Sequence, residues 1–184
     1  MIEVVKDFLP QPVFKYILSI VENEQFEWKW QSNSTPGDNK FKFGKIIFTH
    51  PSLSGGRGYT DNELMPLFGM FVELQNEHQS HRTQHLLKMK LNLYPNEGKQ
   101  VQHGIHKDIV DKNLLDSVVD KMVITSVYNF HTCNGYTMIG DEKVPSIANQ
   151  IVIFNQTEHY GVTQSDIPRR IILNMDIKND RKKE

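Results

Sequence analysis

Two side chains that can bind a metal ion, His106 and Asp108, are separated by a single residue of the sequence. The segment 99–110 around them has the composition of a strand, in which residues i and i+2 point to the same face about 6.5–7 Å apart. An imidazole and a carboxylate in this arrangement converge on one cation, while Lys107 points away. Two ligands hold a catalytic metal weakly, so the pattern predicts a third ligand elsewhere in the chain.

His159 is the candidate for this third ligand. It lies 51 residues beyond Asp108, in a turn that follows the apolar segment 151–154. The triad of His106, Asp108 and His159 has the composition of the facial triad of non-haem Fe(II) oxygenases, in which two histidines and one carboxylate leave coordination positions open for substrates. A zinc site more often has a tetrahedral set richer in nitrogen or sulfur, and Cys133 is the only cysteine.

Two arginines, Arg169 and Arg170, open the strand-like segment 169–177, 10 and 11 residues after His159. A guanidinium at this place can bind the far carboxylate of a dicarboxylate through a bidentate pair. Strand alternation puts Arg170 on a face that also carries the polar Asn174, and puts Arg169 on a more uniformly apolar face. The alternation favours Arg170 as the residue that faces a cavity, with Arg169 as the alternative.

The elements that must position these residues can also be read from the periodicity. Apolar residues recur at helical spacing after Pro12, which suits a first helical turn. Asp61 is placed to cap a second helix that begins at Asn62 and runs to about Gln84. From Leu86 onward the period becomes extended, which predicts strands within 86–94, 99–110, 121–130, 135–139, 146–155 and 169–177, in addition to earlier strands at 2–5 and 41–50.

Two helices followed by a run of short strands predict an α+β fold with mainly antiparallel sheets, a sandwich or a barrel. The chain has 184 residues, and we expect one domain over 1–184, because two separate cores would leave each half small. Within this domain we expect N-terminal helical support over about 1–85 and a strand-rich core over about 86–178.

The charge balance argues against nucleic-acid and membrane partners. Lys plus Arg number 21 and Asp plus Glu number 22, for a formal net charge of -1, so no global field attracts a polyanion. No apolar run reaches the roughly 18 residues of a membrane span, and the first residues lack the pattern of a signal peptide. With a single cysteine, these features lead us to expect a cytoplasmic protein.

With these residues in this order, the sequence resembles the Fe(II)- and 2-oxoglutarate-dependent dioxygenases, in the prolyl-4-hydroxylase-like branch with its small bacterial and phage members. That family has an HxD motif, a distal histidine, and an Arg or Lys about ten residues later. Here they correspond to residues 106–108, His159, and Arg169 or Arg170. The segments YNFHTCNGYT and PSIANQIVIFNQTEHYGV are also similar to the family's turn and distal-histidine segments. The resemblance covers nearly the whole chain and is most specific over 88–176.

A further similarity concerns the co-substrate. The segment KLNLYPNEG, upstream of the HxD motif, is similar to the strand of AlkB-like oxygenases in which an N-x-Y pair binds 2-oxoglutarate. Asn92 and Tyr94 occupy those two positions. Because they are residues i and i+2, both can face one cavity.

The resemblance implies a double-stranded β-helix (jelly-roll, cupin-like) core with flanking N-terminal helices. It implies Fe(II) bound by the triad, and 2-oxoglutarate whose distal carboxylate is bound by Arg170, with Tyr94 and Asn92 beside it. The implied enzyme uses O2, decarboxylates 2-oxoglutarate to succinate and CO2, and hydroxylates a C–H bond of a peptide or protein residue, an amino acid or another small molecule. Two alternatives share the fold: an AlkB-like nucleic-acid demethylase and a non-catalytic jelly-roll binding module.

Overall fold

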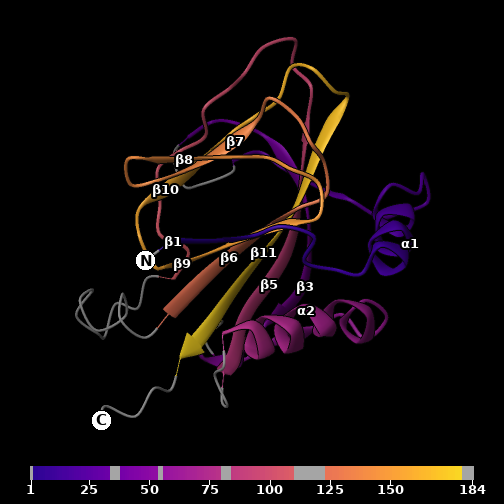
Figure 1. Cartoon of the computed structure of the whole chain (residues 1–184), viewed down its shortest axis with the longest axis vertical. Coiled ribbons are helices and arrows are strands. Elements are labelled where there is room, and N and C mark those ends of the chain that lie inside the picture. Colours follow the sequence, from indigo (N-terminus) through magenta and orange to yellow (C-terminus); the bar gives the residue numbers. More distant parts are fainter. Residues whose placement is uncertain (1, 34–37, 54–55, 80–83, 110–122, 180–184) are drawn as a thin grey trace.

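The computed structural model describes residues 2–33, 38–53, 56–79, 84–109 and 123–179. Figure 1 shows two layers of strands, with both helices on the outer side of the larger layer. The elements in chain order are β1 (Ile2–Val5), α1 (Gln11–Val21), β2 (Lys29–Gln31), β3 (Lys42–Thr49), a 3-10 turn (Pro51–Leu53), β4 (Tyr59–Thr60), α2 (Met65–His78), β5 (Gln84–Pro95), β6 (Val123–Asn129), β7 (Tyr136–Ile139), β8 (Glu142–Pro145), β9 (Gln150–Asn155), β10 (His159–Val162) and β11 (Arg169–Asn179).

The strands form two antiparallel sheets. The larger sheet has the order β1-β9-β6-β11-β5-β3-β2, with β4 paired to β3, and the smaller sheet has the order β10-β7-β8. This is the α+β architecture that the sequence predicts, and the arrangement of the two sheets agrees with a double-stranded β-helix. The region before residue 86 provides the two helices and also adds strands β1 and β3 to the larger sheet.

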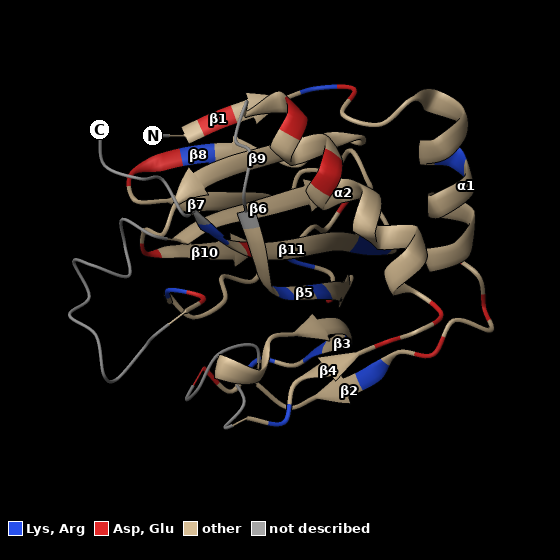
Figure 2. Cartoon of the chain, turned by 90° about the horizontal axis from the view of Figure 1, so that it is seen from below, with Lys and Arg blue, Asp and Glu red and all other residues tan. Residues whose placement is uncertain are grey.

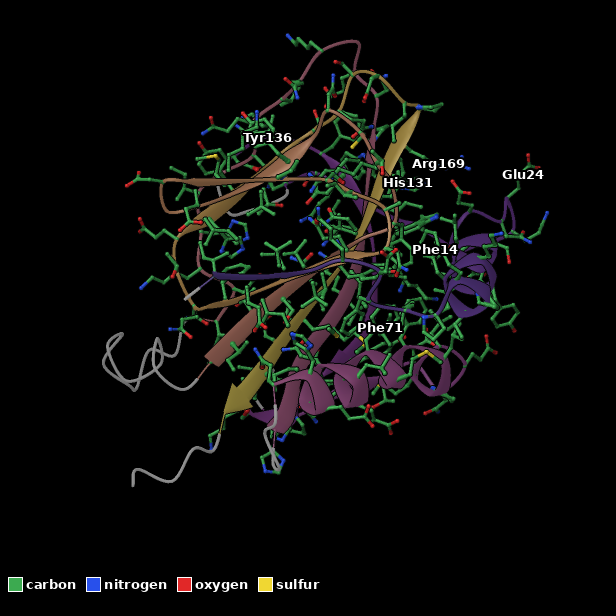
Figure 3. The ribbon with its side chains drawn as sticks, in the orientation of Figure 1. Phe14, Glu24, Phe71, His131, Tyr136 and Arg169 are labelled. Carbon is green, nitrogen blue, oxygen red and sulfur yellow. The ribbon has the colours of Figure 1, made fainter. Side chains whose placement is uncertain are left out.

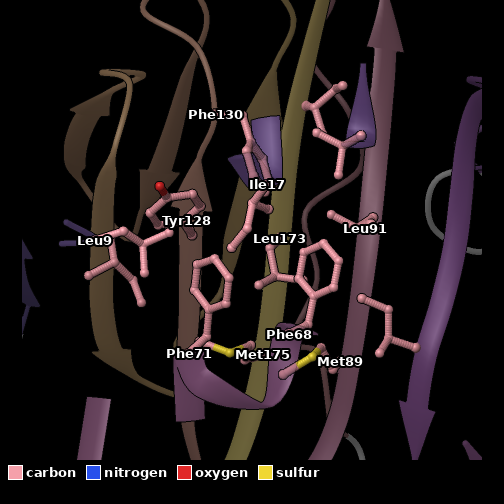
Figure 4. Close-up of a cluster of buried hydrophobic side chains, with 14 of the residues drawn as sticks. Leu9, Ile17, Phe68, Phe71, Met89, Leu91, Tyr128, Phe130, Leu173 and Met175 are labelled. Carbon is pink, nitrogen blue, oxygen red and sulfur yellow. The ribbon is translucent and has the colours of Figure 1, made fainter. Parts of the chain in front are cut away.

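Alternation along β11 separates the core from the space between the sheets. Ile171, Leu173 and Met175 are fully buried in the main hydrophobic cluster, together with Ile17 of α1 and Phe71 of α2. Figure 4 shows several of these side chains packed between α2 and the larger sheet. Full burial of such a side chain contributes about 1.5–3 kcal/mol. The apolar face of β11 therefore fixes the strand against the helices, and its other face points between the sheets.

The second helix is shorter than predicted. Asp61 Oδ1 accepts hydrogen bonds from the backbone N–H groups of Glu63 and Leu64 (3.2 and 3.0 Å), which form a turn before α2 begins at Met65. A start at Asn62 would place Pro66 beyond the first turn, where its missing N–H and its ring disrupt the helix. The helix ends at His78, and β5 begins at Gln84, so the expected end near residue 84 was wrong. Neither described helix is long and apolar enough to span a membrane.

The segment 99–109 is not the regular strand that its composition predicts. Two isolated bridges join it to β10, Gln102 to Val162 and His106 to His159. The segment thus follows β10 at the edge of the smaller sheet without a continuous ladder. This irregular course determines where its histidines point.

Candidate active site

The three residues of the triad meet at one point between the sheets. Ligand atoms of His106, Asp108 and His159 all lie within 4.8 Å of one another. His159 Nε2 is 3.1 Å from Asp108 Oδ2, and His106 Nε2 is 3.8 Å from Asp108 Oδ1. The two histidines are antiparallel partners whose backbone N–H and C=O groups exchange two bonds of 3.0 Å. The predicted grouping of the three side chains is therefore present.

Backbone carbonyls orient both imidazole rings. His106 Nδ1 lies 2.9 Å from the carbonyl oxygen of Gly104, and His159 Nδ1 lies 2.9 Å from that of Thr157. A ring nitrogen beside a carbonyl oxygen must donate, so the proton of a neutral ring is on Nδ1 and the lone pair is on Nε2. Such outer hydrogen bonds are the usual way in which a metal-binding histidine is fixed.

The triad fits a divalent cation. Asp108 Oδ2 and His159 Nε2 are buried, and neither forms a hydrogen bond with adequate geometry. A buried polar atom without a partner costs about 1–3 kcal/mol, which a bound cation would offset. Two imidazole nitrogens and one carboxylate oxygen are the donor set of non-haem Fe(II) sites.

Electrostatics prepare the carboxylate for this role. Burial alone would raise the pKa of Asp108, but His159, Lys88 and His106 together hold it well below its usual range. Burial lowers the pKa of His106, against the attraction of Asp108. Burial would also lower the pKa of His159, but the adjacent Asp108 raises it. Asp108 is thus ionised at neutral pH, and His159 keeps its proton to higher pH than an isolated imidazole does, so a metal ion competes with that proton.

A cavity of about 560 Å³ extends from the triad between the sheets. Its walls come from the inward faces of β5 and β11, from β7 and β10, and from the segment 103–108. Asn92 and Tyr94 line it from β5, as the sequence predicts, and both are buried. Asn92 Nδ2 donates to Asn174 Oδ1 of the neighbouring strand β11 at 3.4 Å.

Arg170 faces inward, as the alternation predicts, and is 1% exposed. It is not among the residues that line the cavity; Thr137, which does line it, is hydrogen-bonded to the guanidinium. Each of its five N–H groups can be assigned to a protein acceptor at 3.1–3.3 Å: Ser146 Oγ, the carbonyl oxygens of Tyr136 and Val162, Asn129 Oδ1 and Thr137 Oγ1. The charge of Arg170 therefore lies directly behind the cavity wall.

Arg169 points to the opposite side of the sheet. Its side chain is 45% exposed and lies 3.7 Å from Glu22, just after α1. Figure 3 shows Arg169 and His131 on the side of the molecule that carries α1, away from Tyr136. The structure thus gives Arg170, and not Arg169, the inward orientation.

Strand alternation misplaces two residues of the segment 99–109. It puts Lys107 on the face away from the triad, as expected above, and His103 on the face opposite to that of His106, yet both line the cavity. The alternation fails because 99–109 is not a regular strand. Thr137, Lys42 and Lys90 also line the cavity. Lys90 could have been identified from the sequence, because it is two residues before Asn92 on the same strand and alternation puts both on one face.

No protein-family model matches the sequence, and no curated protein sequence is similar to it. Solved structures of 2OG-Fe(II) oxygenases are similar to the whole fold. One is an oxidoreductase of the 2OG-Fe(II) oxygenase family from Burkholderia pseudomallei (TM-score 0.68, 9% identity, covering 96% of this chain and 84% of that chain). Another is the viral collagen prolyl hydroxylase of Paramecium Bursaria Chlorella virus-1 in its 2OG complex (TM-score 0.57, 11% identity, covering 98% of this chain and 96% of that chain). A third is a prolyl-4-hydroxylase from Pseudomonas putida (TM-score 0.58, 13% identity, covering 98% of this chain and 92% of that chain). The chain therefore has the fold of the 2OG-Fe(II) oxygenases, as the sequence resemblance implied.

Proposed function

We propose that the protein is an Fe(II)- and 2-oxoglutarate-dependent dioxygenase that hydroxylates a C–H bond of a peptide or protein residue, an amino acid or another small molecule. The observation that carries this proposal is the triad, whose ligand atoms lie within 4.8 Å of one another at the end of a cavity. The fold shared with 2OG-Fe(II) oxygenases supports it. The net charge of -1 leads us to propose this substrate class over a nucleic acid. With one cysteine, we propose a cytoplasmic location.

The co-substrate would lie with its distal carboxylate at the Arg170 end of the cavity. Thr137 Oγ1 accepts a hydrogen bond from Arg170 Nη2 at 3.2 Å, so the hydroxyl proton of Thr137 is free to bind a carboxylate in the cavity. Tyr94, which is opposite Arg170 in the ladder of β5 and β11, offers a second hydroxyl. Arg170 supplies the positive charge behind both groups, and Asn92 lines the wall next to them.

Fe(II), when bound by the triad, supplies with O2 the redox chemistry that converts 2-oxoglutarate to succinate and CO2 and inserts one oxygen atom into a C–H bond. The chain supplies position and exclusion of water. His106 and His159 are fixed by carbonyl oxygens, so their Nε2 atoms face the cavity. Val127 and Ile172 give the cavity an apolar side, which limits water around the reacting groups.

Succinate formation by the purified protein tests the proposal. With Fe(II), 2-oxoglutarate and O2 we expect slow succinate formation that a cognate substrate accelerates. His159→Ala should abolish it, whereas His50→Ala, outside the cavity, should keep it. If the wild-type protein binds neither metal nor 2-oxoglutarate, the chain is a binding module that shares only the fold.

A further inference from the structure

The larger sheet carries a second group of cationic side chains into the cavity, on strands β5 and β3 beside the strand of Arg170. Lys42 on β3 and Lys90 on β5 both line the cavity, and they are called the lysine pair. Figure 2 shows the basic residues of β3 and β5 in blue on neighbouring strands. Lys88 also lines the cavity, but its ammonium group already faces Asp108 at 3.7 Å and Asp176 at 4.0 Å.

Among the described residues, the lysine pair has no such counter-charge. Within the described parts of the chain, no carboxylate lies within 4.0 Å of either ammonium group. Lys90 Nζ donates to the neutral Gln31 Oε1 at 2.8 Å, and Lys42 Nζ lies 5.8 Å from the centre of the Tyr94 ring. Lys42 is only 7% exposed. A cation buried in this way is unfavourable unless an anion accompanies it.

Burial and repulsion act on the pair together. Burial and the positive charges of Lys42 and Lys88 together lower the pKa of Lys90 to about 7, against the attraction of Asp108. An anion beside the two lysines would relieve this repulsion.

The lysine pair extends from the triad toward the end of the cavity that we assign to 2-oxoglutarate. Lys90 is opposite Asn174 in the ladder, four residues along β11 from Arg170, or about 13 Å at 3.3 Å per residue. Lys90 lies on the triad side, because Lys88, two residues before it, contacts Asp108. Lys42 lies nearer to the co-substrate, because its Nζ is 5.8 Å from the centre of the Tyr94 ring. A carboxylate held by both lysines would therefore lie between the triad and Tyr94.

We propose that Lys42 and Lys90 bind a carboxylate of the primary substrate, which is therefore a small carboxylic acid such as a free amino acid. This inference rests on the proposed function and narrows its substrate class. An interior residue of a peptide has no main-chain carboxylate to offer. A free acid held by the lysine pair would place its C–H bonds beside the triad.

Matched acids and amides test the inference by binding as well as by turnover. The protein is loaded with Mn(II) and 2-oxoglutarate, and the common L-amino acids and their carboxamides are titrated by calorimetry. We expect at least one acid to bind at least tenfold more tightly than its amide. Lys42→Met and Lys90→Met should each weaken the binding of that acid at least tenfold, whereas Lys29→Met, on the exposed surface of β2, should leave it unchanged. The same acid should stimulate succinate formation by the Fe(II) enzyme.

Binding of 2-oxoglutarate separates the outcomes. If the lysine variants no longer bind 2-oxoglutarate but still bind the acid, the lysine pair belongs to the co-substrate site and the inference is wrong. Equal binding of acids and amides, or an affinity that neither lysine variant changes, would also overturn it. Failure of the wild-type protein to bind Mn(II) and 2-oxoglutarate would instead contradict the proposed function. Lys90→Arg keeps the charge, so recovery of acid binding in that variant would exclude a loss through misfolding.

Discussion

His159 Nε2 lies 3.1 Å from Asp108 Oδ2, although 51 residues separate the two in the sequence, and both atoms are buried without a hydrogen bond. An imidazole and a carboxylate that satisfied each other would form a well-aligned hydrogen bond. Here they face each other as two ligands of one ion would. His106 completes the arrangement from the segment bridged to His159.

Metal affinity should rise with pH. The pKa of His106 is lowered by burial, so this ring is already neutral near pH 7, and Asp108 is ionised. Burial would lower the pKa of His159, but Asp108 raises it, so this ring keeps its proton to higher pH. Metal binding should therefore displace the His159 proton wherever that ring is still protonated, and it should weaken as the pH falls through the raised pKa of His159. Mn(II) titrations between pH 5 and 8 measure this, and an affinity independent of pH would count against the assignment.

2-Oxoglutarate affinity should depend on Arg170 and not on Arg169. Loss of the buried charge in Arg170→Gln should cost about 2–5 kcal/mol of binding, and Arg169→Gln should cost little. Arg170 also donates hydrogen bonds to five protein acceptors, so the thermal unfolding of Arg170→Gln must be measured together with the titration. If folded Arg170→Gln kept its affinity for 2-oxoglutarate and Arg169→Gln lost it, the co-substrate would depend on Arg169 instead.

Thr137→Val tests the same end of the cavity with less disturbance. The substitution conserves volume and removes the hydroxyl that lies between Arg170 and the cavity. One lost hydrogen bond to a charged group corresponds to about 1.5–3 kcal/mol, or more than tenfold in affinity for 2-oxoglutarate. Thr132→Val, at an exposed position, is the control. Unchanged affinity in Thr137→Val would place the carboxylate elsewhere.

Asp176 should destabilise the metal-free protein progressively as the pH rises from about 4 to 8. Burial, reinforced by the charge of Asp108, raises its pKa to about 8 in the folded chain, against the attraction of Lys88. A raised carboxyl pKa gives stability that is complete below the unfolded value, near 3.9, and is lost as the pH rises through about 8. Asp176→Asn should therefore gain stability over the wild type between pH 4 and 8 and keep that gain above. Denaturant unfolding measures the free energy of unfolding across this range, with Asp141→Asn as the exposed control. If the difference between Asp176→Asn and the wild type did not change with pH, the raised pKa would be contradicted.

The sequence made the triad and the inward arginine predictable for physical reasons. Metal-binding residue types in a particular order identify His106, Asp108 and His159, and alternation on a regular strand identifies Arg170. His103 could not be placed in this way, because alternation has no meaning where the chain makes only isolated bridges. The role of Thr137 depends on a guanidinium whose acceptors come from several elements, which one segment of sequence does not reveal.

The most direct test is the Fe(II) stoichiometry of Asp108→Ala under anaerobic conditions, measured by metal analysis after equilibrium dialysis. We predict one Fe(II) per chain for the wild-type protein and for the control Asp141→Ala, whose carboxylate is exposed. Asp108→Ala should remain folded and bind less than a tenth of this amount, because the triad then offers only two imidazoles. One tightly bound Fe(II) per chain in folded Asp108→Ala would contradict the assignment of the metal site.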